Sequence, residues 1–185
     1  MSSLNDLRSA LPEYAKDLRL NLDSVLGEAG APGLADRQIR AIALASAVAS
    51  RHAPLVSALQ AHAQALLSPA EVAGARAAAA LMAMNNVYYR FTHLAGNKEY
   101  ATLRAGLRMN VMANPGIDKV SFELASLAVS AINGCGSCID SHEKVLRDHG
   151  VTAQGVQSAV RIAAVVHAVA TTLEQAGEAD LAQAA

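Results

Sequence analysis

Both cysteines of the chain lie in one short stretch that ends at His142. Cys135 and Cys138 have the C-x-x-C spacing, which is typical of thiol–disulfide chemistry. His142 follows the second cysteine by four residues, so in a helix the three side chains lie on one face. Asn133 and Gly134 indicate a turn and a helix start. The stretch therefore predicts a C-x-x-C pair at the N-terminus of a helix, with an imidazole one turn beyond it.

Glu123 is the acid that we expect to accompany these groups. It is the only acidic residue between Asp118 and Asp140, and its neighbours in the chain are apolar or small. A buried carboxylate needs a partner, and an imidazole or a thiol would be one. In that position Glu123 could relay protons through His142, which could in turn take the proton of a thiol. A salt bridge on its helix is the alternative role for this residue.

Two thiols, a base and a relay acid predict a redox or peroxidatic site. The helix dipole favours Cys135 as the thiolate, whereas adjacency to His142 favours Cys138. Two inert core cysteines are one alternative, because cysteine is often buried. A zinc site is another, with the two cysteines and His142 as ligands and Glu123 or His62 as the fourth.

Helices must position these groups. The chain is rich in alanine and leucine, which favour helix, and the alternating β-branched pattern of strands is nearly absent. Hydrophobic residues make up 52% of the 185 residues and charged residues 17%, so a substantial core can form. We therefore predict an all-α fold in a single domain spanning residues 1–185.

Composition also argues against several classes of partner. The net charge is −1 and no basic block occurs, which argues against nucleic acid. The first residues lack the basic and apolar regions of a signal peptide, and the longest apolar stretches are too short to span a bilayer. We therefore expect a cytoplasmic protein without a membrane contact. In that reducing compartment a C-x-x-C pair indicates a redox couple that cycles.

Turn and capping residues divide the chain into segments. We expect an N-terminal arm and an amphipathic helix within residues 4–26, and only short helical pieces within 90–118. The longer predicted helices are 35–51, 54–67, 69–89, 119–132, 134–148 and 153–176. A weak repeat at an offset of 80 residues pairs His62 with His142, which suggests pseudo-repeat halves at roughly 35–90 and 117–176. Only the second half carries the cysteines.

The pattern formed by Glu123, Cys135, Cys138 and His142 resembles the carboxymuconolactone decarboxylase-like superfamily in its thiol-peroxidase branch. Three further segments sharpen the resemblance to the alkyl hydroperoxide reductase D family, and their sequences are LPEYAKD at 11–17, MNNVYYR at 84–90 and LRMNVMANPG at 107–116. The likeness covers nearly the whole chain. It implies an all-helical fold with an internal duplication of a helix-pair unit, assembled as a homotrimer.

The same resemblance implies a lipoyl-dependent peroxidase without a bound cofactor or metal. Dihydrolipoamide on a dihydrolipoyl acyltransferase, fed by an NADH-dependent dehydrogenase, would reduce a Cys135–Cys138 disulfide. Electrons would pass to organic peroxides or to the peroxiredoxin alkyl hydroperoxide reductase C. Cys138 would be the peroxidatic nucleophile and proton donor, Cys135 the resolving cysteine, His142 the base and Glu123 the proton relay. The family often has a histidine where this chain has Ser137, which leaves the details of the relay open.

Two other functions stay open. One is a non-enzymatic zinc-binding or redox-sensing module, built on the same cysteines. The other is an enzyme of the carboxymuconolactone decarboxylase type. Decarboxylation does not call for paired cysteines, so the C-x-x-C spacing weighs against it.

Overall fold

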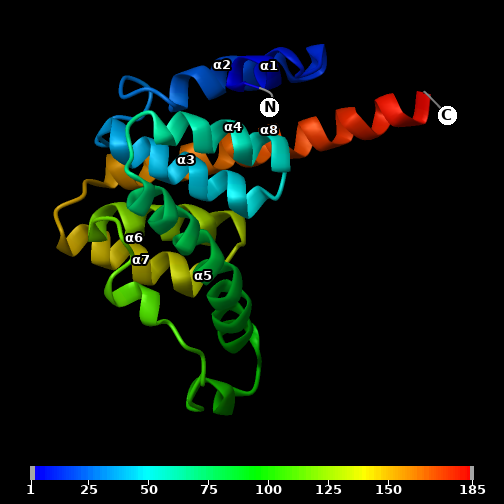
Figure 1. The fold of residues 1–185 in the computed structure, drawn as a ribbon. Coiled ribbons are helices and arrows are strands. Elements are labelled where there is room, and N and C mark those ends of the chain that lie inside the picture. Colours follow the sequence, from blue (N-terminus) through cyan, green and yellow to red (C-terminus); the bar gives the residue numbers. More distant parts are fainter. Residues whose placement is uncertain (1–2, 184–185) are drawn as a thin grey trace.

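The computed structural model describes residues 3–183, and the side chains of residues 3–177. Within this part of the chain the secondary structure is helical and contains no strand, so the all-α prediction is confirmed. Figure 1 shows the arrangement of the helices. In chain order they are α1 (Leu4–Ser9), η1 (Glu13–Ala15), α2 (Lys16–Val25), α3 (Asp36–Ser50), α4 (Ala53–Gln64), α5 (Pro69–Leu94), η2 (Lys98–Ala101), η3 (Asn110–Ala113), α6 (Lys119–Ile132), α7 (Gly136–Asp148) and α8 (Ala153–Gln183).

The predicted helices agree closely with these bounds except at two C-terminal ends, those of α5 and of α8, which continues to Gln183 and not to 176. The helix predicted at 119–132 matches α6 to the residue. The break predicted after residue 89 is wrong, because α5 continues to Leu94. No glycine or proline lies between 85 and 95, and the first helix breaker on that side is Gly96. The pieces that follow are the 3-10 turns η2 and η3.

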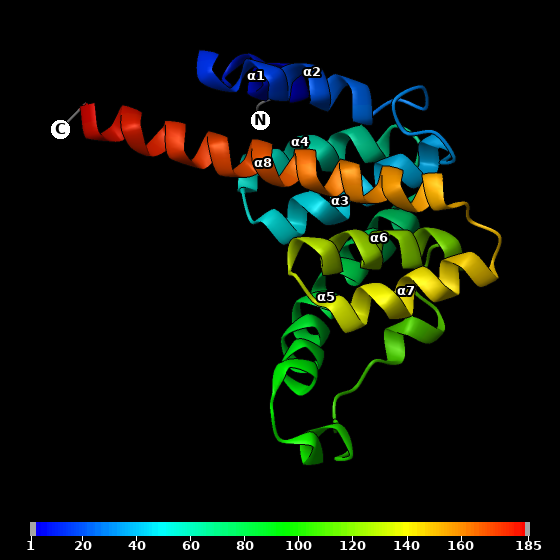
Figure 2. The same ribbon diagram turned by 180° about the vertical axis from the view of Figure 1, so that it is seen from behind.

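α3 and α6 form the centre of the fold. α3 packs against α4, α5, α6 and α8, and α6 packs against α3, α5, α7 and α8. Both helices bury mostly alanine, serine and aliphatic side chains, which let their axes approach closely. Figures 1 and 2 show α1 and α2 lying over α4 and α8 on one side of this pair, while α7 lies on the other side. The helix that carries Glu123, α6, therefore lies at the centre of the protein core.

The helices of the two predicted halves follow one another in the same order. α3 and α6 begin 83 residues apart, and so do α4 and α7. Arg51 and Gly134, also 83 residues apart, each end a helix with a φ of 65°. The offset of 80 residues that paired His62 with His142 is therefore wrong in register, and Leu59 lies at the position equivalent to His142. The duplication and the division into halves stay predictions.

By length and composition alone, α8 could cross a membrane. A window of 18 residues within Ala153–Gly177 has a mean hydropathy of 1.4, and 44% of it is buried. The core helix of a soluble protein meets the same criterion. Ile162, Val166 and Val169 are fully buried in the core that α8 shares with α2, α3 and α6. The absence of a membrane contact stays a prediction.

Candidate active site

The turn between α6 and α7 places the cysteines. Gly134 has a φ of 65° and donates its N–H to the carbonyl of Ala131, while Cys135 donates its N–H to the carbonyl of Ser130. These two bonds form the glycine-dependent motif that commonly ends a helix. They leave Cys135 as the N-cap of α7 and Cys138 in its first turn. The prediction of a C-x-x-C pair at a helix N-terminus is confirmed.

The two sulfur atoms are bonded to each other. Cys135 and Cys138 form a disulfide across a Cα–Cα distance of 5.3 Å. Cys135 is fully buried, whereas 6% of Cys138 is exposed. The Ser137 hydroxyl lies 3.7 Å from the Cys135 Sγ, and because a disulfide sulfur carries no hydrogen, the hydroxyl is the donor. The serine thus contacts the less exposed of the two sulfurs.

Glu123 and His142 meet across the packed faces of α6 and α7. Their Oε2 and Nδ1 atoms are 2.6 Å apart, and each side chain is only 9% exposed. The structure therefore brings together the acid and the imidazole that the sequence pattern singled out. No lysine or arginine pairs with Glu123 among the described residues, so the alternative of an ordinary salt bridge on the helix does not apply.

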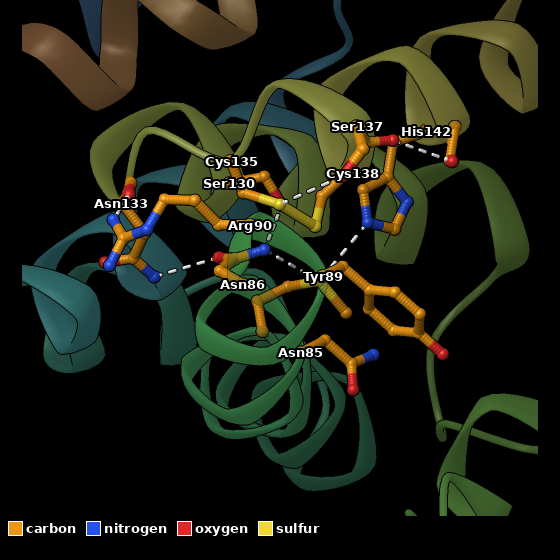
Figure 3. The surroundings of a disulfide bond; sticks show 12 residues. Asn85, Asn86, Tyr89, Arg90, Ser130, Asn133, Cys135, Ser137, Cys138 and His142 are labelled. Carbon is orange, nitrogen blue, oxygen red and sulfur yellow. Dashed lines mark hydrogen bonds between the residues drawn. A yellow bond between two sulfur atoms is a disulfide. The ribbon is translucent and has the colours of Figure 1, made fainter. Parts of the chain in front are cut away.

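α5 contributes the other contact of the imidazole. The Met82 Sδ lies 3.2 Å from the His142 Nε2, and Met82 is 1% exposed. Both ring nitrogens of His142 are therefore engaged, one by a carboxylate from α6 and one by a thioether from α5. Figure 3 shows the ring beside Cys138 and Tyr89. The sequence analysis missed Met82, which lies just outside the segment 84–90 that carried the resemblance.

A pocket of about 290 Å³ opens onto this group. Its walls come from α5, from the segment around η3 and from the first two turns of α7. Cys138 lines the pocket and Cys135 does not. The lining is largely apolar and contains three methionines, and its members are Met82, Asn85, Tyr89, Met109, Met112, Ser137, Cys138, Ser141 and His142. A ligand in this pocket would contact the Cys138 sulfur and the imidazole together.

A network of amides supports the cysteine turn from its other side. The Asn86 Nδ2 donates to the Ser130 Oγ, and the Asn133 Nδ2 donates to the Asn86 Oδ1, each at 2.9 Å. The Arg90 guanidinium donates to the carbonyl of Asn133. In Figure 3, Arg90 and Asn133 lie on one side of Cys135, opposite the side occupied by Tyr89. The sequence indicated a turn at Asn133, and Asn86 and Arg90 lie in the segment 84–90 that carried the resemblance, but the hydrogen bonds between these residues were not predicted.

The electrostatic field at the N-terminus of α7 acts on the cysteines. The first turn of a helix carries unpaired N–H groups and a partial positive charge, and the first turn of α7 contains no acidic residue. In the reduced protein this field stabilises a thiolate at either sulfur, so it does not distinguish between them. Access does, because of the two cysteines only Cys138 lines the pocket.

The zinc site, which the sequence left open as an alternative, has no matching group of ligands among the described residues. Among the described residues no group of three or more His, Cys, Asp or Glu side chains is arranged to hold a metal ion. His62, the alternative fourth ligand, lies on α4 and accepts a bond from Arg40 through its backbone carbonyl. Burial of the ring, and then the charge of Arg40, lower the pKa of His62.

Comparisons with known proteins agree with this geometry. A family model described as the carboxymuconolactone decarboxylase family matches residues 98–180, the part of the chain that contains Glu123, both cysteines and His142. An alkyl hydroperoxide reductase AhpD from Rhodopseudomonas palustris (strain BisB18) is 56% identical over 183 residues, which cover 99% of each chain. A protein of the same name from Streptomyces avermitilis is 55% identical over 98% of this chain and 99% of its own. One from Streptomyces coelicolor is 56% identical over 93% and 95% of the two chains. The chain therefore belongs to the alkyl hydroperoxide reductase AhpD family, within the carboxymuconolactone decarboxylase-like superfamily.

Proposed function

We propose that this protein is an antioxidant thiol peroxidase that reduces organic hydroperoxides with the Cys135–Cys138 pair. Its family makes it an oxidoreductase of peroxide chemistry. The observation that carries the proposal is a disulfide at the wall of an apolar pocket, with a buried imidazole–carboxylate pair beside it. A redox sensor or a structural disulfide does not need a pocket at the sulfur or a proton relay behind it.

Cys138 is the peroxidatic cysteine in this proposal. Its thiol transfers a proton to the pair formed by His142 and Glu123, and the resulting thiolate attacks the terminal oxygen of the peroxide. The O–O bond breaks, the sulfur becomes a sulfenic acid, and the alkoxide leaves as the alcohol after it takes a proton from the relay. The Cys135 thiol then loses its proton and attacks the Cys138 sulfur, the hydroxide that leaves takes that proton to become water, and the disulfide forms. Two electrons have passed from the two thiols to the peroxide.

Exposure supports this assignment of the two cysteines. Cys138 lines the pocket and Cys135 is fully buried behind it. Ser137, which stands where the family often has a histidine, contacts the Cys135 sulfur. We infer that its hydroxyl donates to the Cys135 thiolate as that thiolate forms, and that it takes no part in proton transfer at Cys138.

The pocket supports an organic peroxide as the substrate. Methionine thioethers and the Tyr89 ring give an apolar lining that receives an alkyl or aryl group, and methionine adapts to tails of different shape. The relatives are named for alkyl hydroperoxides, which have such tails.

We further propose the source and the second destination of the electrons. Dihydrolipoamide, carried by a lipoylated dihydrolipoyl acyltransferase and recharged by its NADH-dependent dehydrogenase, would reduce the disulfide. The same dithiol would pass electrons to the peroxiredoxin alkyl hydroperoxide reductase C. The apolar pocket also suits the hydrocarbon chain of a lipoyl group, and no cofactor has to be bound. The reaction would take place in the cytoplasm.

A homotrimer completes the proposal. Residues 87–112, which we call the arm, comprise the end of α5 and the connection that hangs away from the body in Figures 1 and 2. Most of the large apolar side chains exposed among the described residues lie there, namely Val87, Phe91, Leu94, Tyr100, Leu103, Val111 and Met112. A cluster of this kind is typical of a surface that another chain covers. The arm also supplies part of the pocket wall, so assembly and the site are linked.

Single-turnover oxidation tests the proposal. The protein is reduced, freed of reductant and mixed with one equivalent of cumene hydroperoxide, and thiols and cumyl alcohol are then counted. We expect two thiols to disappear for each alcohol formed, and we expect the Cys138→Ser variant to form none. Thiols that survive the peroxide, or that vanish without alcohol, would contradict direct peroxide reduction.

A further inference from the structure

The imidazole of His142 is held by two acceptors of different strength. Its Nδ1 faces the Glu123 Oε2 at 2.6 Å, and its Nε2 faces the Met82 Sδ at 3.2 Å. A thioether has lone pairs and no hydrogen to donate, so a hydrogen bond at this contact requires the hydrogen on Nε2. We propose that Met82 is a positioning residue, which keeps a hydrogen on the Nε2 of His142 and fixes the ring as a donor while the disulfide is closed. This inference rests on the proposed function, because it concerns how His142 serves Cys138.

Burial makes the thioether the partner of that hydrogen. Met82 is 1% exposed and His142 is 7% exposed, so the contact is largely shielded from solvent. An N–H group that is buried without an acceptor costs free energy, and a weak acceptor satisfies it. Around the ring, α6 presents Glu123 and α7 presents Cys138, while α5 presents Tyr89 on the same pocket. Of Glu123, Cys138 and Tyr89, only Glu123 is in hydrogen-bonding contact with the ring, and Met82 makes the second contact.

The proton that Glu123 and His142 share is thereby confined to the contact between Oε2 and Nδ1. With the hydrogen on Nε2 retained, the remaining proton is shared between Nδ1 and the Glu123 carboxylate across 2.6 Å. The ring cannot turn over without breaking both contacts. His142 therefore keeps the same nitrogen, with its hydrogen, toward Met82 in every oxidised molecule, in the pocket that Cys138 also lines.

Reduction of the disulfide uses that hydrogen. A thiolate of the dithiol reductant enters the pocket and attacks the sulfur of Cys138, the S–S bond breaks, and Cys135 leaves as a thiolate. The second thiol of the reductant, after losing its proton, attacks its own sulfur in the mixed disulfide and closes a ring disulfide. Cys138 then leaves as a thiolate, and the Nε2–H of His142, released from Met82, donates to it. The reductant has lost two electrons and two protons, of which one protonates the Cys135 thiolate and the other replaces the hydrogen that His142 gives to Cys138, so the protein disulfide has become two thiols.

Met82 contacts the imidazole of His142, and in this it differs from Met109, a second methionine of the same pocket. The Met109 sulfur accepts from the side-chain amide of Asn85 and, among the described hydrogen bonds, has none to the imidazole, whereas the Met82 sulfur accepts from the side-chain amide of Asn86 at 3.8 Å and also faces His142 at 3.2 Å. The two methionines are equal in chemistry and line the same cavity. The variant Met109→Leu is therefore a matched control for Met82→Leu in any measurement made on His142. Leucine has nearly the volume of methionine, so both variants keep the packing.

Nitrogen-15 NMR of the histidine rings tests the inference on the oxidised protein, without peroxide or reductant. In the wild type we expect a protonated Nε2 on His142, with a hydrogen that exchanges slowly with water. Met82→Leu should speed this exchange by roughly two- to fivefold, the equilibrium worth of one weak hydrogen bond, and Met109→Leu should leave it unchanged. Met82→Gln, whose carbonyl oxygen is again an acceptor at similar reach, should restore slow exchange.

Three results would overturn the inference. They are an unprotonated Nε2 in the wild type, equal exchange in Met82→Leu and the wild type, and fast exchange in Met82→Gln. The first needs no variant, so the inference stays testable if a substitution prevents folding. Because the measurement does not involve turnover, its failure is distinguishable from a failure of the peroxidase activity.

Discussion

At the scale of residues, the site depends on a few contacts between chemically different groups. A carboxylate holds one nitrogen of His142, a thioether faces the other, and a disulfide sulfur lines the same pocket as the ring. Each contact comes from a different helix, since Glu123 belongs to α6, Met82 to α5 and Cys138 to α7. Proton transfer therefore depends on the packing of three helices.

The first prediction concerns Glu123. Replacing it by glutamine leaves a side chain of the same shape that cannot accept and return a proton, so turnover should fall by roughly two orders of magnitude, the usual worth of acid–base catalysis. The measurement is the steady-state rate of peroxide reduction. Glu143→Gln is the control, because Glu143 lies on α7 and, among the residues that the structure describes, pairs only with Arg147 at 3.8 Å. Equal rates for Glu123→Gln and the wild type would return Glu123 to a structural role.

The second prediction concerns the cysteines. Limiting iodoacetamide added to the reduced protein should label Cys138 in preference to Cys135, because Cys138 lines the pocket and Cys135 is fully buried. Peptide mass spectrometry locates the label. Preferential labelling of Cys135 would reverse the two roles.

The chemistry of the site could be predicted from the sequence only where it is local. Cys135, Cys138 and His142 lie within eight residues, and their spacing on a helix brings them together whatever the rest of the fold does. Glu123 was found because a lone acid in an apolar segment needs a partner. Met82 lies 60 residues from His142, and their contact depends on how α5 crosses α7. No spacing in the sequence reports that crossing.

At the scale of elements, capping decides where the helices begin and end. The glycine motif at Gly134 ends α6 and makes Cys135 the N-cap of α7. Ser68 and Glu71 begin α5 with reciprocal bonds, each side chain accepting from the backbone N–H of the other. These local signals explain why the predicted helix starts agree with the structure. The end of α5 was missed because no capping signal precedes Gly96, and only the structure shows that the helix runs on into the arm.

The third prediction concerns Glu71. Hydrogen bonds from Arg37, and then from Ser68, lower its pKa from 4.5 to about 2. Because the folded protein holds this carboxylate ionised more strongly than the unfolded chain does, its contribution to stability is complete above pH 4.5 and is lost as the pH falls toward 2.

Thermal melts of Glu71→Gln and the wild type check this. At pH 7 the variant should melt up to about 3 °C lower, because glutamine can still accept from the Ser68 N–H but loses the charge-assisted bonds from Arg37, which for a partly exposed pair are worth up to about 1 kcal/mol. The difference should shrink steadily below pH 4.5 and vanish only below pH 2, where the carboxyl is protonated in the folded protein as well. Asp17→Asn, which changes a carboxylate in the first turn of α2, is the control. A difference in melting temperature that does not change with pH would show that Glu71 acts through packing alone.

At the scale of the whole molecule, the arm connects assembly with the site. It exposes a cluster of apolar side chains at one end of the molecule, and it also supplies Tyr89, Met109 and Met112 to the pocket. The sequence predicted the fold class from composition and helical periodicity. It could not predict the arm. The sequence pattern of an apolar helix face is the same whether that face packs against its own chain or against another copy of the protein.

The fourth prediction concerns this assembly. Light scattering on the wild type should give a mass of three times 19.1 kDa. Leu94→Glu, which places a charge in the arm at a side chain that is 72% exposed, should lower that mass. Leu20→Glu changes a leucine of α2 that is 69% exposed outside the arm, and it should not. A wild-type protein of monomer mass would contradict the proposed trimer.

The most direct test of the central claim is NADH oxidation in a reconstituted system. The protein is combined with a lipoylated acyltransferase, its NADH-dependent dehydrogenase and either cumene hydroperoxide or a peroxiredoxin with peroxide. The account predicts NADH consumption that depends on this protein and on peroxide, and that Cys138→Ser abolishes. Absence of consumption with every peroxide and peroxiredoxin tested, while the dehydrogenase and acyltransferase remain active, would contradict it.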